Sequence, residues 1–115
     1  MRVLILAKED HQSRAATPPT PEEMAEFQKF NEELVKAGVV VGDGRLYPSS
    51  QGKRLQFEGK KRRIIDGPWA ETKELVAGYW LWQVRSMDEA LEWLKRAPYE
   101  GGTFEVREVF EYEGM

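Results

Sequence analysis

LVAGYWLWQV, residues Leu75–Val84, is the stretch of sequence that decides the fold. Its alternation predicts a long strand with Trp80 and Trp82 on one face and Tyr79 and Leu81 on the other. Large apolar side chains on both faces are typical of a strand that is buried on both sides. We therefore expect other parts of the structure to cover both faces of this strand.

The segments around this strand predict alternating strands and helices. Ser86-Met87-Asp88-Glu89 is a capping box that opens a helix ending at Pro98, and Thr20-Pro21-Glu22-Glu23 opens an earlier helix that ends at Gly38. Further strands are expected over 2–7, 39–41, 54–57, 61–65 and 103–110, with 54–57 and 61–65 joined as a hairpin. We assign the order β-α-β-β-β-α-β, which predicts an α+β fold, a ferredoxin-like sandwich formed by a single domain over residues 1–115.

One face of this sheet has no predicted helix to cover it, and this predicts that two copies of the chain associate. Two helices cover one face of a sheet, yet the strands at 2–7 and 75–84 are apolar on both faces. The second face would expose Trp, Tyr and Leu side chains over an area that is large for a monomer. We therefore expect a homodimer in which two sheets pack face to face.

Composition excludes several classes of protein. The 115 residues contain no cysteine, which excludes disulfide frameworks, Cys-ligated zinc and thiolate catalysis. His11 is the sole histidine, so a single chain cannot build a multi-His metal site. No apolar run is long enough for a membrane span or a signal peptide, and no cofactor fingerprint or phosphate-binding loop is present. We expect a cytoplasmic protein that uses no cofactor and contacts no membrane.

The charge is unevenly distributed along the chain. Residues 53–63 contain six basic side chains and one acidic one, a local charge of +5 within a net charge of −3, so the remainder carries −8. A basic hairpin could contact phosphates, but Phe57 is its one aromatic residue and the acidic remainder repels a polyanion. Lysine and arginine on an edge hairpin also prevent edge-to-edge aggregation. We expect no nucleic-acid partner.

The segment DGPWAETKE, Asp66–Glu74, carries the most specific information about function. Four ionisable side chains fall in a loop that leads into the most apolar strand. Desolvation there raises the pKa of a carboxyl group and a neighbouring positive charge lowers it, and such a shifted pKa is what general acid–base catalysis requires. Asp66 is the candidate acid–base group, and Lys73 is its electrostatic partner. Trp69 is a candidate wall of a small-molecule pocket, and the other candidate ligand-binding residues are Glu71, Glu74 and Tyr79. The alternative is structural, because Asp before Gly-Pro commonly makes turn hydrogen bonds.

Two further residues are secondary candidates for catalysis. His11 follows the first strand, close to Glu9 and Asp10, and it titrates near neutral pH if its pKa is unperturbed. A lone loop histidine is more often solvated and without a role, and one histidine is a weak basis for a metal site. Glu23, at the start of the first helix, is the second candidate.

Asp66–Glu74 resembles the signature of the DGPF group of the YCII-related domain family, with Trp69 where phenylalanine is usual. The similarity spans nearly the whole chain and continues through 2–7, 21–24, 37–39, 78–80, 88–93 and 101–107. The resemblance implies a ferredoxin-like fold that pairs into a dimeric α/β barrel. Some members lie near, or are fused to, extracytoplasmic-function sigma factors, which implies a partner in a sigma-factor pathway.

The resemblance leaves the chemistry open. Relatives outside the DGPF group have a His-Asp pair thought to be catalytic, with the histidine two residues after a proline that starts the first helix. Glu23 occupies that place here, so the histidine of the pair is missing. Three hypotheses follow: an acid–base enzyme acting on a small polar or aromatic molecule, a non-catalytic binder that uses the same pocket, and a protein-interaction module.

Overall fold

A four-stranded antiparallel sheet is the centre of the structure, a computed structural model that describes residues 1–8, 20–68, 76–99 and 101–111. Its strands, in the order β2-β5-β1-β6, are Val40–Arg45, Val76–Gln83, Arg2–Lys8 and Phe104–Glu108. The predicted strand at 75–84 is β5, and it has a neighbour on each side. Trp82 lies opposite Val3 on β1 and opposite Val40 on β2.

The described residues form two α-helices, α2 (Pro21–Lys36) and α3 (Met87–Lys95). Both predicted helix starts are confirmed. The Thr20 hydroxyl oxygen accepts a hydrogen bond of 3.2 Å from the backbone N–H of Glu23, and the Ser86 hydroxyl oxygen accepts one of 3.1 Å from the backbone N–H of Glu89. At 16 and 9 residues, neither described helix has the length and apolar character that a membrane span requires.

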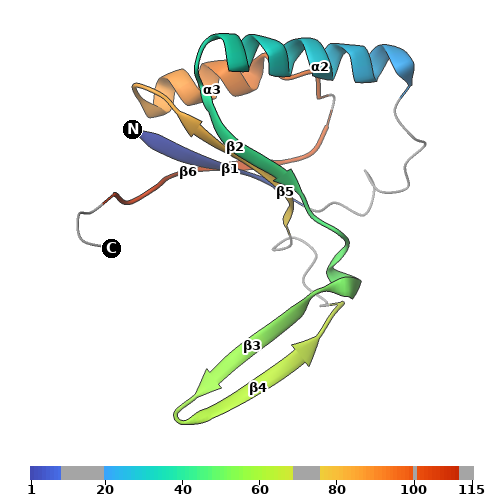
Figure 1. Ribbon diagram of the computed structural model, residues 1–115, viewed down its shortest axis with the longest axis vertical. Coiled ribbons are helices and arrows are strands. Elements are labelled where there is room, and N and C mark those ends of the chain that lie inside the picture. Colours follow the sequence, from blue (N-terminus) through green and yellow to red (C-terminus); the bar gives the residue numbers. More distant parts are fainter. Residues whose placement is uncertain (9–19, 69–75, 100, 112–115) are drawn as a thin grey trace.

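Both helices lie on one face of the sheet, and the hydrophobic core forms between them and the strands (Figure 1). The largest fully buried side chains are Trp82, Ile5, Leu34 and Val3. Arg96, which follows α3, donates to the Glu33 carboxylate of α2 at 2.6 Å and joins the two helices at the surface.

The other face of the sheet carries apolar side chains that no described helix covers. Leu4 lies opposite Leu81, and Leu6 lies opposite Tyr79, in the register of β1 and β5. These four residues form what we call the open face. Leu4, Leu6 and Leu81 are half-buried by their neighbours, and Tyr79 is 40% exposed. The predicted division of β5 into Trp80 and Trp82 on one side and Tyr79 and Leu81 on the other is confirmed.

A β-hairpin stands apart from the main sheet as a second, two-stranded sheet. It consists of β3 (Lys53–Glu58) and β4 (Lys61–Asp66), and a short 3-10 helix, η1 (Ser49–Gln51), precedes it. All six predicted strand ranges correspond to observed strands, and the observed order is β-α-β-β-β-β-α-β. The assigned order β-α-β-β-β-α-β therefore has one strand fewer than the ranges from which it was built. The hairpin is an insertion between β2 and β5. Without it the order is β-α-β-β-α-β, which is compatible with a ferredoxin-like fold.

Candidate functional site

Asp66 lies at the end of β4, at the base of the hairpin, and it pairs with Lys53 of β3. The Lys53 ammonium is 2.6 Å from the Asp66 carboxylate, and both side chains are largely exposed, at 69% and 73%. An exposed ion pair contributes little to stability. The described part of the chain therefore gives Asp66 a partner across the hairpin and no apolar enclosure.

The residue after Asp66 has a structural role. The backbone N–H of Gly67 donates to the Gly52 carbonyl oxygen at 3.0 Å. A Cβ atom built on Gly67 would overlap the carbonyl oxygen of Ser49 in η1, so only glycine allows the chain to pass this close. The first part of the Asp66–Glu74 motif therefore anchors the base of the hairpin.

Gly67→Ala is expected to destabilise this base by about 1–3 kcal/mol, because backbone atoms must move to relieve the overlap. Amide hydrogen exchange over residues 53–66 measures the loss. Gly42→Ala is the matched control, since a Cβ atom there meets nothing within 4 Å. Equal exchange rates in the two variants would contradict the assigned role of Gly67.

The other predicted site residues are not gathered with Asp66. Glu23 lies exposed in the first turn of α2, and Tyr79 lies on the open face with its ring against Gly44. These residues occupy three separate elements. The remaining candidates lie outside the described residues: His11, Trp69, Glu71, Lys73 and Glu74. Residues 69–75 connect Pro68 to Val76, the first residue of β5.

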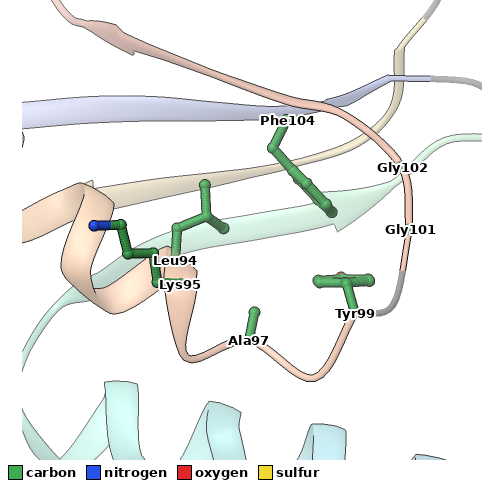
Figure 2. A pocket seen from close by; sticks show the side chains of 7 residues that line it. All are labelled: Leu94, Lys95, Ala97, Tyr99, Gly101, Gly102 and Phe104. Carbon is green, nitrogen blue, oxygen red and sulfur yellow. The ribbon is translucent and has the colours of Figure 1, made fainter.

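A hollow of about 320 Å³ opens at the end of the sheet where β5 begins and β6 starts (Figure 2). We call it the α3–β6 hollow. It is lined by Leu94, Lys95, Ala97, Tyr99, Gly101, Gly102 and Phe104. The chain reaches it because α3 ends at Lys95 and turns back toward the sheet, with Gly102 at a φ of 97° that favours glycine.

Tyr99 is the central residue of an aromatic cluster beside this hollow. Its ring centroid is 4.6 Å from that of Phe104 and 4.7 Å from that of Phe27 on α2, and 6.4 Å from that of Trp80 on β5. Figure 2 shows the Phe104 side chain extending from its strand toward Tyr99. Helix, sheet and connecting segment therefore meet at one phenol ring, which is 41% exposed.

A row of four residues, paired across the sheet, lies beside Tyr99 and includes two small members. Arg45, Gly78, Ala7 and Phe104 lie opposite one another across β2, β5, β1 and β6. The two inner members have small side chains or none. The Tyr99 ring packs against Phe104 at one end of the row, and the charge of Arg45 at the other end acts on its phenol. Burial raises the pKa of the Tyr99 phenol, and the positive charge of Arg45 partly opposes that rise.

A second charged contact lies at the same end of the sheet. The Lys8 ammonium is 3.0 Å from the Glu105 carboxylate. This hydrogen bond and the positive charge of Lys8 lower the pKa of the Glu105 carboxyl, and Arg107 adds to the effect. Lys8 is therefore already paired, which leaves Arg45 as the cation at the Tyr99 row.

Sequence reasoning did not identify Tyr99, Phe104 or Arg45 as site residues. The available signal was an aromatic residue directly after the helix-ending Pro98, followed by the pair Gly101-Gly102. Arg45 gave no local signal, because its place depends on strand register. For metals, no group of three His, Asp or Glu side chains gathers within residues 1–8, 20–68, 76–99 and 101–111.

Comparison with known proteins identifies the family. The family model of the YCII-related domain matches residues 1–113. The chain is also 32% identical to a protein of Rhizobium meliloti (strain 1021) described as uncharacterized, over 93 residues that cover 78% of this chain and 75% of that protein. Because the family model matches nearly the full length, the chain belongs to the YCII-related domain family.

Proposed function

We propose that this protein is a homodimer that binds a small carboxylic acid with an aromatic or apolar body in the α3–β6 hollow. The observation that carries the proposal is that Tyr99 and Phe104 line the hollow at one end of a row across the sheet, whose other end is Arg45, a cation close enough to act on the Tyr99 phenol. A few polar groups that converge on an apolar wall are typical of small-molecule sites.

The chemistry of the two polar residues favours an anionic oxygen. A raised pKa keeps the Tyr99 phenol protonated, so its O–H donates a hydrogen bond. The guanidinium of Arg45 presents paired donors that match a carboxylate, and it forms no salt bridge with any described residue. Lys95 is a weaker candidate, because its ammonium already lies 3.0 Å from Glu92.

The Asp66–Glu74 motif extends the same site in this proposal. Residues 69–75 enter β5 two residues before Gly78, a member of the row. Trp69 is the further ligand contact that we assign, as an aromatic wall. The carboxylates of Glu71 and Glu74 would repel an anionic ligand, so this proposal assigns them no contact with it, and the motif supports membership of the DGPF group. An acid–base enzyme with Asp66, Lys73, His11 and Glu23 is the alternative. The exposed pairing of Asp66 with Lys53 favours binding without turnover.

The homodimer is supported by the open face. Leu4, Leu6, Tyr79 and Leu81 form adjacent cross-strand pairs that no described helix covers. A second sheet laid on this face buries these side chains and gives the dimeric barrel that the family resemblance implies.

Ligand binding is tested with benzoate and its neutral counterpart benzyl alcohol. We expect benzoate to raise the melting temperature of the wild type more than benzyl alcohol does. Arg45→Gln is expected to weaken benzoate binding roughly ten- to hundredfold, because hydrogen bonds to charged groups contribute about 1.5–3 kcal/mol. Thermal shift and calorimetric titration measure both effects. Arg85→Gln is the matched control, since Arg85 is 94% exposed and lies before α3.

Two results would contradict the proposal. One is a wild type that binds neither probe, and the other is an Arg45→Gln variant that binds benzoate as the wild type does. With no small ligand at all, the protein-interaction role with a sigma-factor-pathway partner becomes the better hypothesis.

A further inference from the structure

The β3–β4 hairpin projects from the body, and its two strands pack on each other rather than on another described helix or strand (Figure 1). Every residue from Lys53 to Asp66 is exposed except Ile65, which is half-buried. The projection makes the molecule extended: its radius of gyration is 16.5 Å, where a compact chain of this length has about 13 Å. We call residues 53–66 the arm.

Three of the four apolar side chains of the arm lie on one face, which we call its apolar face, above the Lys53–Asp66 pair at the base. The fourth, Ile65, lies opposite Arg54 on the other face, which we call the polar face. Leu55 lies opposite Ile64, and Phe57 lies opposite Arg62, on the apolar face. The three apolar side chains are 52%, 67% and 65% exposed for Leu55, Ile64 and Phe57, and the Arg62 guanidinium stacks 4.4 Å from the centre of the Phe57 ring. Gln56 and Arg63 face each other on the opposite side. Such a division is typical of a ribbon that packs on another surface.

A two-stranded hairpin is only marginally stable alone in water. Packing of its exposed apolar face on another surface would therefore stabilise it. Among the described residues, the body of the same chain does not cover this face. The occupant must accept both apolar side chains and a strongly basic ribbon.

We propose that the arm crosses to a second copy of this chain and packs its apolar face on that subunit. The inference rests on the homodimer of the proposed function. The arm extends away from the sheet on the side opposite the helices, which is the side where a second copy would cover the open face (Figure 1).

Charge favours the same occupant. Residues 53–63 carry +5 while the remainder of the chain carries −8, so an arm laid on the body of a second copy meets opposite charge. Exposed acidic residues on α2 include Glu22, Glu26 and Glu32.

The test uses crosslinking, because the chain contains no cysteine and one can be introduced at will. Phe57→Cys labelled with a maleimide benzophenone is expected to form, on illumination, a species of twice 13.3 kDa. Arg85→Cys, at a 94% exposed position outside the arm, is the labelling control and is expected to remain at 13.3 kDa. A crosslink confined within one chain would overturn the proposal.

A second set of measurements tests the packing of the arm independently of the existence of the dimer. In the wild type, amide exchange over residues 53–66 is expected to slow at concentrations where sedimentation shows a dimer. Leu55→Ser/Phe57→Ser/Ile64→Ser is expected to weaken the dimer about tenfold or more. Gln56→Ser/Arg63→Ser alters the polar face as a control, and the dissociation constant of the dimer is expected to stay within about threefold of the wild-type value. If the wild type is a dimer in which the arm amides still exchange freely, and if the triple variant dimerises as tightly as the wild type, the proposed packing of the arm is wrong while the dimer stands. A wild type that is monomeric throughout would overturn the dimer of the proposed function, and the arm with it.

Discussion

Trp82→Ala is expected to lower the free energy of unfolding by about 3–5 kcal/mol, a large share of the roughly 5–15 kcal/mol that stabilises a domain. Trp82 is fully buried. It lies opposite Val3 on one neighbouring strand and Val40 on the other, and its ring centroid is 5.4 Å from that of Trp80. Removing the indole opens a cavity where three strands meet the helices, and the rigid strands cannot close it. Urea unfolding followed by circular dichroism measures the loss.

Trp82→Phe is the matched control for that prediction. The buried indole N–H of Trp82 has no hydrogen-bond partner among the described residues. Phenylalanine keeps most of the ring and removes a donor whose burial without a partner costs about 1–3 kcal/mol. The expected loss is therefore below about 2 kcal/mol. If both variants unfold at the urea concentration of the wild type, Trp82 does not occupy the centre of the core.

The core and the helix boundaries could be predicted because their signals are local. The alternation in β5 assigns Trp82 to one face and Leu81 to the other, and the Thr20 and Ser86 caps mark the first residues of the helices. The local pattern predicted the hairpin but not its separation from the main sheet, since a hairpin that forms its own sheet has the same local pattern as one that joins the main sheet.

The candidate site could not be predicted in the same way. Arg45, Gly78 and Phe104 come from three distant segments, and only the strand register brings them into one row. The prediction for Asp66 relied on its closeness in sequence to Lys73, whereas the hairpin pairs it with Lys53, thirteen residues earlier. Closeness in sequence therefore did not predict the described partner of Asp66.

Leu81→Glu is expected to have the largest effect on assembly. Leu81 lies on the open face of the central strand β5, opposite Leu4. In the proposed dimer a glutamate there brings an unpaired carboxylate into an apolar interface, so the dissociation constant is expected to rise by about a hundredfold or more. Sedimentation equilibrium measures this as a change from twice 13.3 kDa to 13.3 kDa. Leu91→Glu makes the same chemical change on α3, at a position that is 40% exposed, and is expected to leave the mass unchanged.

The Leu81→Glu variant also tests whether the two parts of the proposed function are independent. Leu81 and the α3–β6 hollow lie on opposite faces of the sheet, so the substitution changes no residue that lines the hollow. A folded monomer is therefore expected to bind benzoate within about threefold of the wild-type affinity, because the interactions of Arg45 and Tyr99 remain. A variant that stays dimeric would contradict the open-face interface. A well-folded monomer that no longer binds benzoate would mean that the second copy completes the ligand site.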